Sequence, residues 1–108
     1  MEATPVIING RDYPVKYGFA ALRAFTDETN ITLNQLGQIG DNMTITQALA
    51  LVWAGLKDGA RVTGSKFEMS IDEVADLIDK DQEALTRVLS VFQKSISQPK
   101  ASKGKKKA

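Results

Sequence analysis

The sequence contains no cysteine and no histidine among its 108 residues. Without cysteine the chain has no disulfide framework and no thiolate nucleophile. Without histidine it lacks the usual general base at neutral pH, and both absences together exclude Ser-His-Asp triads and zinc sites with nitrogen and sulfur ligands. No P-loop or dinucleotide-binding glycine motif occurs. We therefore expect no catalytic residues, no cofactor, no metal ligands and no enzyme activity.

Long hydrophobic runs are also lacking. No apolar stretch approaches the ~18 residues that a membrane span needs. The opening "MEATPVIING" has no basic region followed by an apolar stretch, so we expect neither a secretory signal nor a membrane partner. A hydrophobic fraction of 43% with 25% charged residues is ordinary for a globular protein. The length predicts a single domain, which we place at residues 1–98.

Positive charge is scarce in this domain and abundant after it. The first 98 residues carry nine basic and thirteen acidic side chains, a net charge of −4. Residues 99–108 hold no acid, and their only apolar side chains are alanines, so we expect a disordered, Lys-rich tail. Its five basic residues are Lys100, Lys103, Lys105, Lys106 and Lys107.

The stretch "TPVIINGRDYPVKY" predicts a β-hairpin at about residues 5–16. Asn9-Gly10 follows three β-branched residues, and this pair favours a type I′ turn because both central positions need a positive φ. Pro14 has no backbone donor, which places the second strand at a sheet edge. Since a lone hairpin is marginal in water, we expect it to pack on helices or to extend a sheet in a homo-oligomer.

Apolar residues at helical spacing predict about five short helices after the hairpin. The fold class is therefore mainly α: a small single domain with an N-terminal β-hairpin and a basic tail. The apolar positions that carry this pattern are Phe19, Leu22 and Phe25; Ile45, Leu49, Val52, Trp53 and Leu56; Ile71, Val74, Ala75 and Ile78; Leu85, Val88, Leu89, Phe92 and Ile96.

Polar residues and glycines indicate where these helices begin and end. Asn30 is a stop signal, and Gly59 or Gly64 ends the central helix. The predicted starts are Thr32 for a brief helix through Ile39, Thr44 or Thr46 for the central helix, Ser70 with Glu73 as a capping box, and Asp81 for the last helix.

The acidic cluster from Asp72 to Asp81 admits two interpretations. Paired carboxylates bind hard cations or act as acid and base. Negative charge is also favoured in the first turn of a helix, where Asp72 and Glu73 are expected. We favour the structural interpretation, in which these acids cap helices and face solvent.

The stretch "IDEVADLIDKDQEALTRVL" also resembles a helix-turn-helix in outline. The second helix of such a pair places its first residues at base edges. Here those residues include Asp81 and Glu83, which phosphates would repel. Only Arg87 and Lys94 are basic on this helix, so nucleic acid is an unfavoured partner for the domain.

Three phrases carry a resemblance to a known family. They are "INGRDYPVKYGFAALRAFTDETN", "ALALVWAGLKDGARVTG" and "FEMSIDEVADLIDKDQEALTRVLSVF". Over most of the range from Ile7 to Phe92 the sequence resembles the tail assembly chaperones of long-tailed bacteriophages. The resemblance implies a small helical protein without catalysis that binds the tape measure protein, which is long, helical and aggregation-prone.

The same resemblance implies where and with what the protein acts. Such chaperones keep the tape measure protein soluble in the host bacterial cytoplasm until the tail tube polymerises, and they are absent from the mature virion. The tail tube protein is a further candidate partner. So is a long form of the chain itself, because many such genes contain a ribosomal frameshift.

Three interpretations of the basic tail stay open. The first is a solubilising tail or an expression remnant. The second is a trace of a slippery site in the messenger RNA, since such sites are often runs of adenines, and runs of adenines can encode adjacent lysines such as Lys105 to Lys107. The third is an electrostatic tether to an acidic partner, screened beyond about 8 Å at physiological salt.

Five apolar residues are our candidates for the partner-binding surface. The last helix precedes the tail and can move without unravelling the middle of the domain. The alternative is that these residues are ordinary core, because periodic apolar side chains are usually buried. Trp53 has the same two interpretations, since tryptophan is common both in hot spots and in cores. The candidates are Trp53, Leu56, Val88, Phe92 and Ile96.

Two other functions remain open alternatives. One is a structural connector or terminator subunit that stays in the phage tail. The other is a small nucleic-acid-binding regulator that uses the basic tail.

Overall fold

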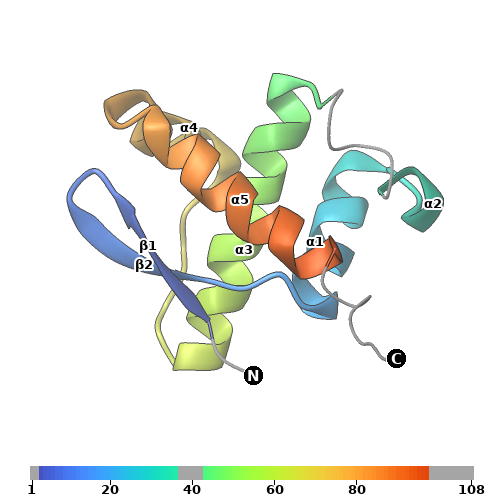
Figure 1. Ribbon diagram of the computed structural model, residues 1–108, viewed down its shortest axis with the longest axis horizontal. Helices are drawn as coiled ribbons and strands as arrows, with labels where there is room; N and C mark the ends of the chain where they lie inside the picture. Colours follow the sequence, from blue (N-terminus) through green and yellow to red (C-terminus); the bar gives the residue numbers. More distant parts are fainter. Residues whose placement is uncertain (1–2, 37–42, 98–108) are drawn as a thin grey trace.

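The computed structural model contains an N-terminal β-hairpin and five α-helices within its described residues, 3–36 and 43–97 (Figure 1). This confirms the predicted fold class; the tail at residues 99–108 lies outside the described residues. None of the described helices is long and apolar enough to cross a membrane. The elements are β1 (Thr4–Ile8), β2 (Arg11–Val15), α1 (Phe19–Thr29), α2 (Leu33–Leu36), α3 (Ile45–Thr63), α4 (Ile71–Lys80) and α5 (Glu83–Ser97).

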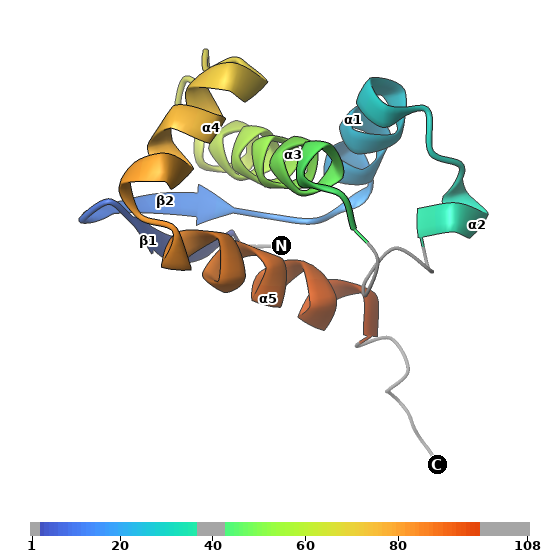
Figure 2. The ribbon, with the colours of Figure 1, turned by 90° about the horizontal axis from the view of Figure 1, so that it is seen from above.

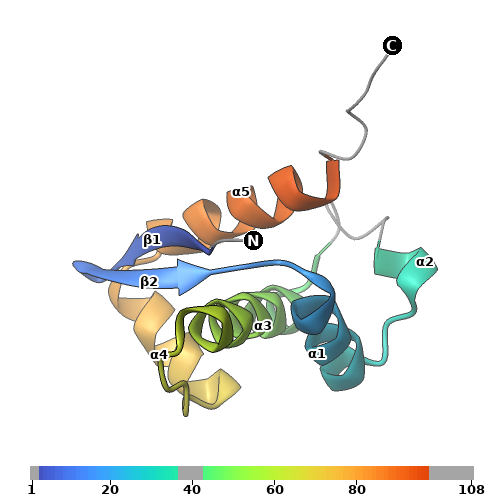
Figure 3. The ribbon, with the colours of Figure 1, turned by 90° about the horizontal axis from the view of Figure 1, so that it is seen from below.

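Helix α3 is the centre of the fold, and it contacts β2, α1, α4 and α5. Figure 2 shows α4, α3 and α1 side by side in one layer, with the hairpin and α5 in a second layer. The opposite view in Figure 3 shows the same order, with β2 between α3 and β1. The core lies between the layers, where Leu51, Val52 and Leu56 of α3 are almost fully buried.

The hairpin forms as predicted. Asn9 and Gly10 have φ values of 52° and 81°, and the antiparallel strands pair Ile8 with Arg11 next to this turn. Alternation along the strands turns Val6 and Ile8 inward, to 5% and 0% exposure. The hairpin therefore uses one apolar face to pack on the helices.

The end of β2 near Pro14 is covered by α3. The backbone of Pro14 lies against Gly59 of α3, so closely that a Cβ at Gly59 would collide with the Pro14 carbonyl group. Just beyond the strand, the Lys16 amide donates to the Gly55 carbonyl oxygen at 3.1 Å. The hairpin thus packs on a helix, one of the alternatives expected for it, and self-association stays a prediction.

The ends of α3 confirm one of each pair of alternatives. Thr44 is the N-cap, and its side chain and that of Gln47 form a capping box. Gly64 is the C-cap, with a φ of 77°. Gly59 lies inside the helix, because at this position glycine serves the close approach of Pro14 rather than a helix end.

Asp81 has a different role from the one predicted. It is the C-cap of α4, and its carboxylate accepts hydrogen bonds from the Asn9 amide at 2.9 Å and from Arg87 at 2.6 Å. Arg87 also donates to the Ile7 carbonyl oxygen. Asp81 therefore joins the hairpin turn to α5 instead of capping that helix through its side chain.

The remaining end signals are largely confirmed. Asn30 is the C-cap of α1 with a φ of 60°, and Ser70 with Glu73 forms the capping box of α4. Helix α2 ends at Leu36, and Ile39 lies outside the described residues. The predicted stripe of α1 is wrong at one position, because Phe19 in the first turn is 85% exposed.

Tyr17 joins the two layers. Its hydroxyl donates to the Leu51 carbonyl oxygen at 2.7 Å, and its ring packs edge-on against Phe92 with a centroid distance of 5.3 Å. The ring has space because residue 55 is a glycine, and a Cβ at this position would collide with the ring. Burial raises the pKa of the Tyr17 phenol far above its usual range.

We expect this burial to make the protein sensitive to alkali. Above pH about 10 the unfolded chain releases the Tyr17 proton and the folded chain retains it, so stability falls by up to about 1.4 kcal/mol per pH unit. Tyr17→Phe should remove this slope while costing about 1 kcal/mol at neutral pH, because Leu51 loses its donor. Urea midpoints from pH about 8 to about 11 measure both effects. Parallel curves for the two proteins would contradict the expectation.

Candidate partner-binding groove

Three of the five predicted partner-binding residues are core residues in this structure. Leu56, Val88 and Phe92 are 2%, 0% and 1% exposed, which matches the alternative interpretation of their periodicity. They have no surface for a partner in this conformation, and α5 is held against β1 and α3. Ile96 belongs to α5, but its side chain lies outside the described part of the chain. A role for these residues in another conformation stays a prediction.

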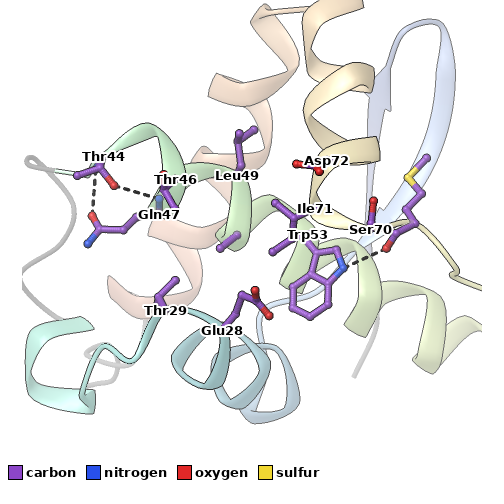
Figure 4. A pocket seen from close by; sticks show the side chains of 12 residues that line it. Glu28, Thr29, Thr44, Thr46, Gln47, Leu49, Trp53, Ser70, Ile71 and Asp72 are labelled. Carbon is purple, nitrogen blue, oxygen red and sulfur yellow. Dashed lines mark hydrogen bonds between the residues drawn. The ribbon is translucent and has the colours of Figure 1, made fainter.

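Trp53 is the predicted residue that does reach the surface. Its ring is half-buried, and its Nε1 donates to the Met69 carbonyl oxygen at 3.1 Å. The Lys57 ammonium lies 4.9 Å from the centre of the ring. These contacts fix the ring in one orientation, in which it forms part of the wall of an open groove (Figure 4).

This groove, which we call the α3 groove, lies over the first half of α3, between the end of α1 and the start of α4. Its volume is about 860 Å³. Five side chains of α3 follow one another along it at helical spacing, and α1 and α4 supply its two rims. Its lining includes Glu28, Leu49, Ala50, Trp53, Ile71 and Asp72.

The floor of the α3 groove is apolar and its rims are acidic. Leu49, Ile71 and Trp53 are half-buried and show part of their surface to solvent. Figure 4 shows Glu28 and Asp72 on opposite sides of Ile71 and Trp53. Neither carboxylate takes part in a salt bridge within the described residues.

A second hollow of about 350 Å³ follows along the seam of α1 and α3. It differs in charge, because Arg23, Lys57 and Arg61 line it together with two aspartates. One of these, Asp58, is buried and accepts two hydrogen bonds from Arg61. The acidic rim is thus a local property of the α3 groove and does not continue along the seam.

A third hollow lies on the other flank of α3, toward α5, and is about 210 Å³ in volume. It has no charged side chain, and Ile45 beside it is 79% exposed. Leu85 and Leu89 of α5 complete its apolar surface. This hollow is smaller than the α3 groove, and it has no charged group that would orient a partner.

Other chemistry is sparse. Within residues 3–36 and 43–97 no group of three or more histidine, cysteine, aspartate or glutamate side chains is placed to hold a metal ion. Arg87, the basic residue that a DNA-binding helix would need, is engaged by Asp81 and by the carbonyl oxygen of Ile7. The carboxylates of α4 cap the helix or lie exposed, as the structural interpretation predicted.

Two of the three phrases that carry the family resemblance contact each other in space. The segment "YPVKYGF" of the first phrase packs on "WAGLKDGAR" of the second, through Pro14 against Gly59 and Tyr17 against Gly55. The Gly18 amide donates to the Asp58 carboxylate across the same junction. Except for Trp53, which also lines the α3 groove, the residues named at this junction hold the fold together.

Comparison with known proteins adds no relative to this picture. The chain matches no family model, and comparison with curated proteins and with solved structures finds no significant match. The candidate site is therefore argued from its geometry and from the resemblance in sequence.

Sequence reasoning found Trp53 and missed the rest of the α3 groove. Leu49 was identified only as one residue of an apolar stripe, and Asp72 only as an acid at a helix start. Glu28 had no signal at all, because its position opposite Asp72 depends on how α1 and α4 pack against α3. The spacing of Leu49, Ala50 and Trp53 is the one local signal that marks a shared face.

Proposed function

We propose that this protein is a tail assembly chaperone of a long-tailed bacteriophage, which binds the tape measure protein and keeps it soluble. In this proposal it acts in the host cytoplasm until the tail tube polymerises and is absent from the finished virion. The observation that carries the proposal is the α3 groove, an open groove in which a strip of apolar side chains lies between polar and acidic rims. The resemblance of the three phrases supports the same role.

The size and chemistry of the α3 groove suit a helical partner. A helix with its side chains is about 10 Å across, so a groove of about 860 Å³ accepts roughly two turns. Amphipathic helices dock by placing apolar residues at positions i, i+3, i+4 and i+7 into such grooves. A long helical protein with exposed apolar stripes offers many segments of this kind, and covering them prevents aggregation.

Co-expression with the candidate tape measure protein tests the proposal. This partner is the long, coiled-coil-rich protein encoded just downstream, and any frameshifted long form should be supplied as well. We expect the partner to become soluble and to co-purify with the chain. A partner that stays insoluble and unbound would overturn the proposal.

A groove variant tests whether the α3 groove is the surface used. We expect Leu49→Gln to weaken co-purification roughly tenfold, because the partner loses a contact worth about 1.5 kcal/mol of apolar burial. The matched control is Leu77→Gln, which changes another half-buried leucine, on α4, that does not line the α3 groove. Equal losses in both variants at equal folded fraction, measured by circular dichroism, would place the binding surface elsewhere.

The two alternative functions predict different outcomes. A structural connector or terminator subunit would be found in purified virions, whereas the chaperone would not. A nucleic-acid-binding regulator would bind DNA in a salt-dependent way that deletion of residues 99–108 abolishes. Because the nucleic-acid alternative uses the basic tail, Leu49→Gln should leave DNA binding unchanged.

A further inference from the structure

The rims of the α3 groove carry charges that the fold does not use. Glu28 on α1 and Asp72 on α4 face the groove from opposite sides (Figure 4). By contrast, the carboxylates of Asp58 and Asp81, which lie outside the α3 groove, are each engaged by an arginine. Asp72 gains some stability from the first turn of α4, but Glu28 is at the end of α1, where a negative charge opposes the helix dipole. The fold itself therefore does not explain Glu28.

A basic residue of a bound partner would offset the unfavourable interaction of Glu28 with the helix dipole. A helix lying on Leu49, Ile71 and Trp53 would bring the residues that flank its apolar stripe close to both rims. Lysine or arginine at these flanking positions would meet Glu28 on one side and Asp72 on the other. Acidic residues at the same positions would be repelled from both sides.

The charges that line the second hollow confine the preference for basic flanking residues to the α3 groove. Along the seam of α1 and α3, the second hollow is lined by three basic residues and two aspartates, and its Arg23 and Lys57 form no salt bridge within the described residues. A basic residue of the partner is thus attracted by the acidic rims of the α3 groove and gains no comparable attraction at the second hollow.

We propose that the α3 groove selects an amphipathic helix whose apolar stripe is flanked on both sides by lysine or arginine. This rests on the proposed function and deepens it by stating which helical segments of the partner are bound. Segments with the same apolar stripe and acidic flanks are left free. The apolar floor supplies most of the affinity, and the two carboxylates supply the choice among segments.

Trp53 provides the readout, because it is the only tryptophan in the chain and lies in the α3 groove. The probes are three synthetic helical peptides of about 18 residues without tryptophan. They share one apolar stripe and carry lysine, glutamine or glutamate at the flanking positions. Titration at low ionic strength, followed by Trp53 fluorescence, gives the dissociation constant of each peptide.

We expect the Lys-flanked peptide to bind most tightly and the Glu-flanked peptide least tightly. In the double variant Glu28→Gln/Asp72→Asn, the Lys-flanked peptide should bind roughly fivefold more weakly, since each exposed pair contributes modestly. The matched control Asp76→Asn/Asp79→Asn removes the same charge from exposed positions outside the α3 groove and should change binding less than twofold. The difference between the doubles should vanish in about 1 M salt.

Three results would overturn the inference. If Gln-flanked and Lys-flanked peptides bind equally, the rims do not select charge, and the proposed function stands without this refinement. If the two double variants weaken binding equally, the effect reflects net charge only. If no peptide binds, the α3 groove does not dock helices, and the co-expression experiment then decides separately whether the protein is a chaperone that uses another surface.

Discussion

Gly59→Ala should lower the free energy of unfolding by about 2–3 kcal/mol, although alanine is the better helix former. Gly59 lies in the interior of α3, where this exchange would otherwise gain up to about 1 kcal/mol. A Cβ at this position collides with the carbonyl group of Pro14 and with the amide nitrogen of Val15. Because these are backbone atoms, no change of rotamer relieves the overlap, and β2 must move away from α3.

The loss should extend to the hairpin as a whole. Val15 at the end of β2 is fully buried, and Tyr17 just beyond it joins the two layers. A shift of β2 therefore disturbs the packing of both layers and not only the contact with Gly59. We expect the variant to show a lower urea midpoint and weaker near-ultraviolet circular dichroism from the Tyr17 environment.

Val62→Ala is the matched control in the same helix. Val62 is 36% exposed, so this substitution changes helix propensity with little effect on packing. We expect its free energy of unfolding to stay within about 0.5 kcal/mol of the parent. If Gly59→Ala is as stable as Val62→Ala, the hairpin does not lie against α3 as described.

Gly59 also shows why sequence reasoning predicted some features and not others. The turn at Asn9-Gly10 and the cap at Ser70 were predicted correctly, and the cap at Thr44 was one of two predicted alternatives, because their chemistry is local to a few residues. A glycine late in a helical pattern, by contrast, serves either as a helix end or as a point of close approach. Gly59 is a point of close approach because Pro14, which is distant in sequence, packs against it in space.

The same distinction applies to the candidate site. Periodicity placed Leu56 and Val88 on apolar faces, but it does not distinguish a face that meets the core from one that meets a partner. That decision depends on which element covers the face, and here α3 and α5 cover each other. Glu28 and Asp72 come from separate helices, so no spacing in the sequence relates them.

Asp58→Ala should be the most destabilising change of a polar residue, with a loss of about 3 kcal/mol. Asp58 is 2% exposed and accepts hydrogen bonds from Arg61 at 2.8 and 3.0 Å and from the Gly18 amide at 3.3 Å. Lys16 lies 3.8 Å away, and its side chain is 13% exposed. Alanine leaves the Gly18 donor and the Lys16 ammonium without their acceptor in a place that water hardly reaches.

Two further variants separate the contributions of Asp58. Asp58→Asn keeps an acceptor for the Gly18 amide and loses the charge, so we expect about half the loss of the alanine variant. Arg61→Gln removes the shorter of the two ion pairs of Asp58, but the Arg61 side chain is 61% exposed, and an exposed partner contributes less than about 1 kcal/mol. Urea denaturation at neutral pH gives the order of the three losses.

That order decides what the buried carboxylate does. If Asp58→Ala loses most and Arg61→Gln least, the main role of Asp58 is to hold the start of α1 on α3 through Gly18 and Lys16. If Arg61→Gln loses as much as Asp58→Ala, the ion pair with Arg61 dominates and this explanation is wrong. Since α1 carries Glu28 at its other end, a carboxylate that fixes α1 on α3 also fixes one rim of the α3 groove. Asp58→Asn should therefore weaken binding of the Lys-flanked peptide without any contact between Asp58 and the peptide.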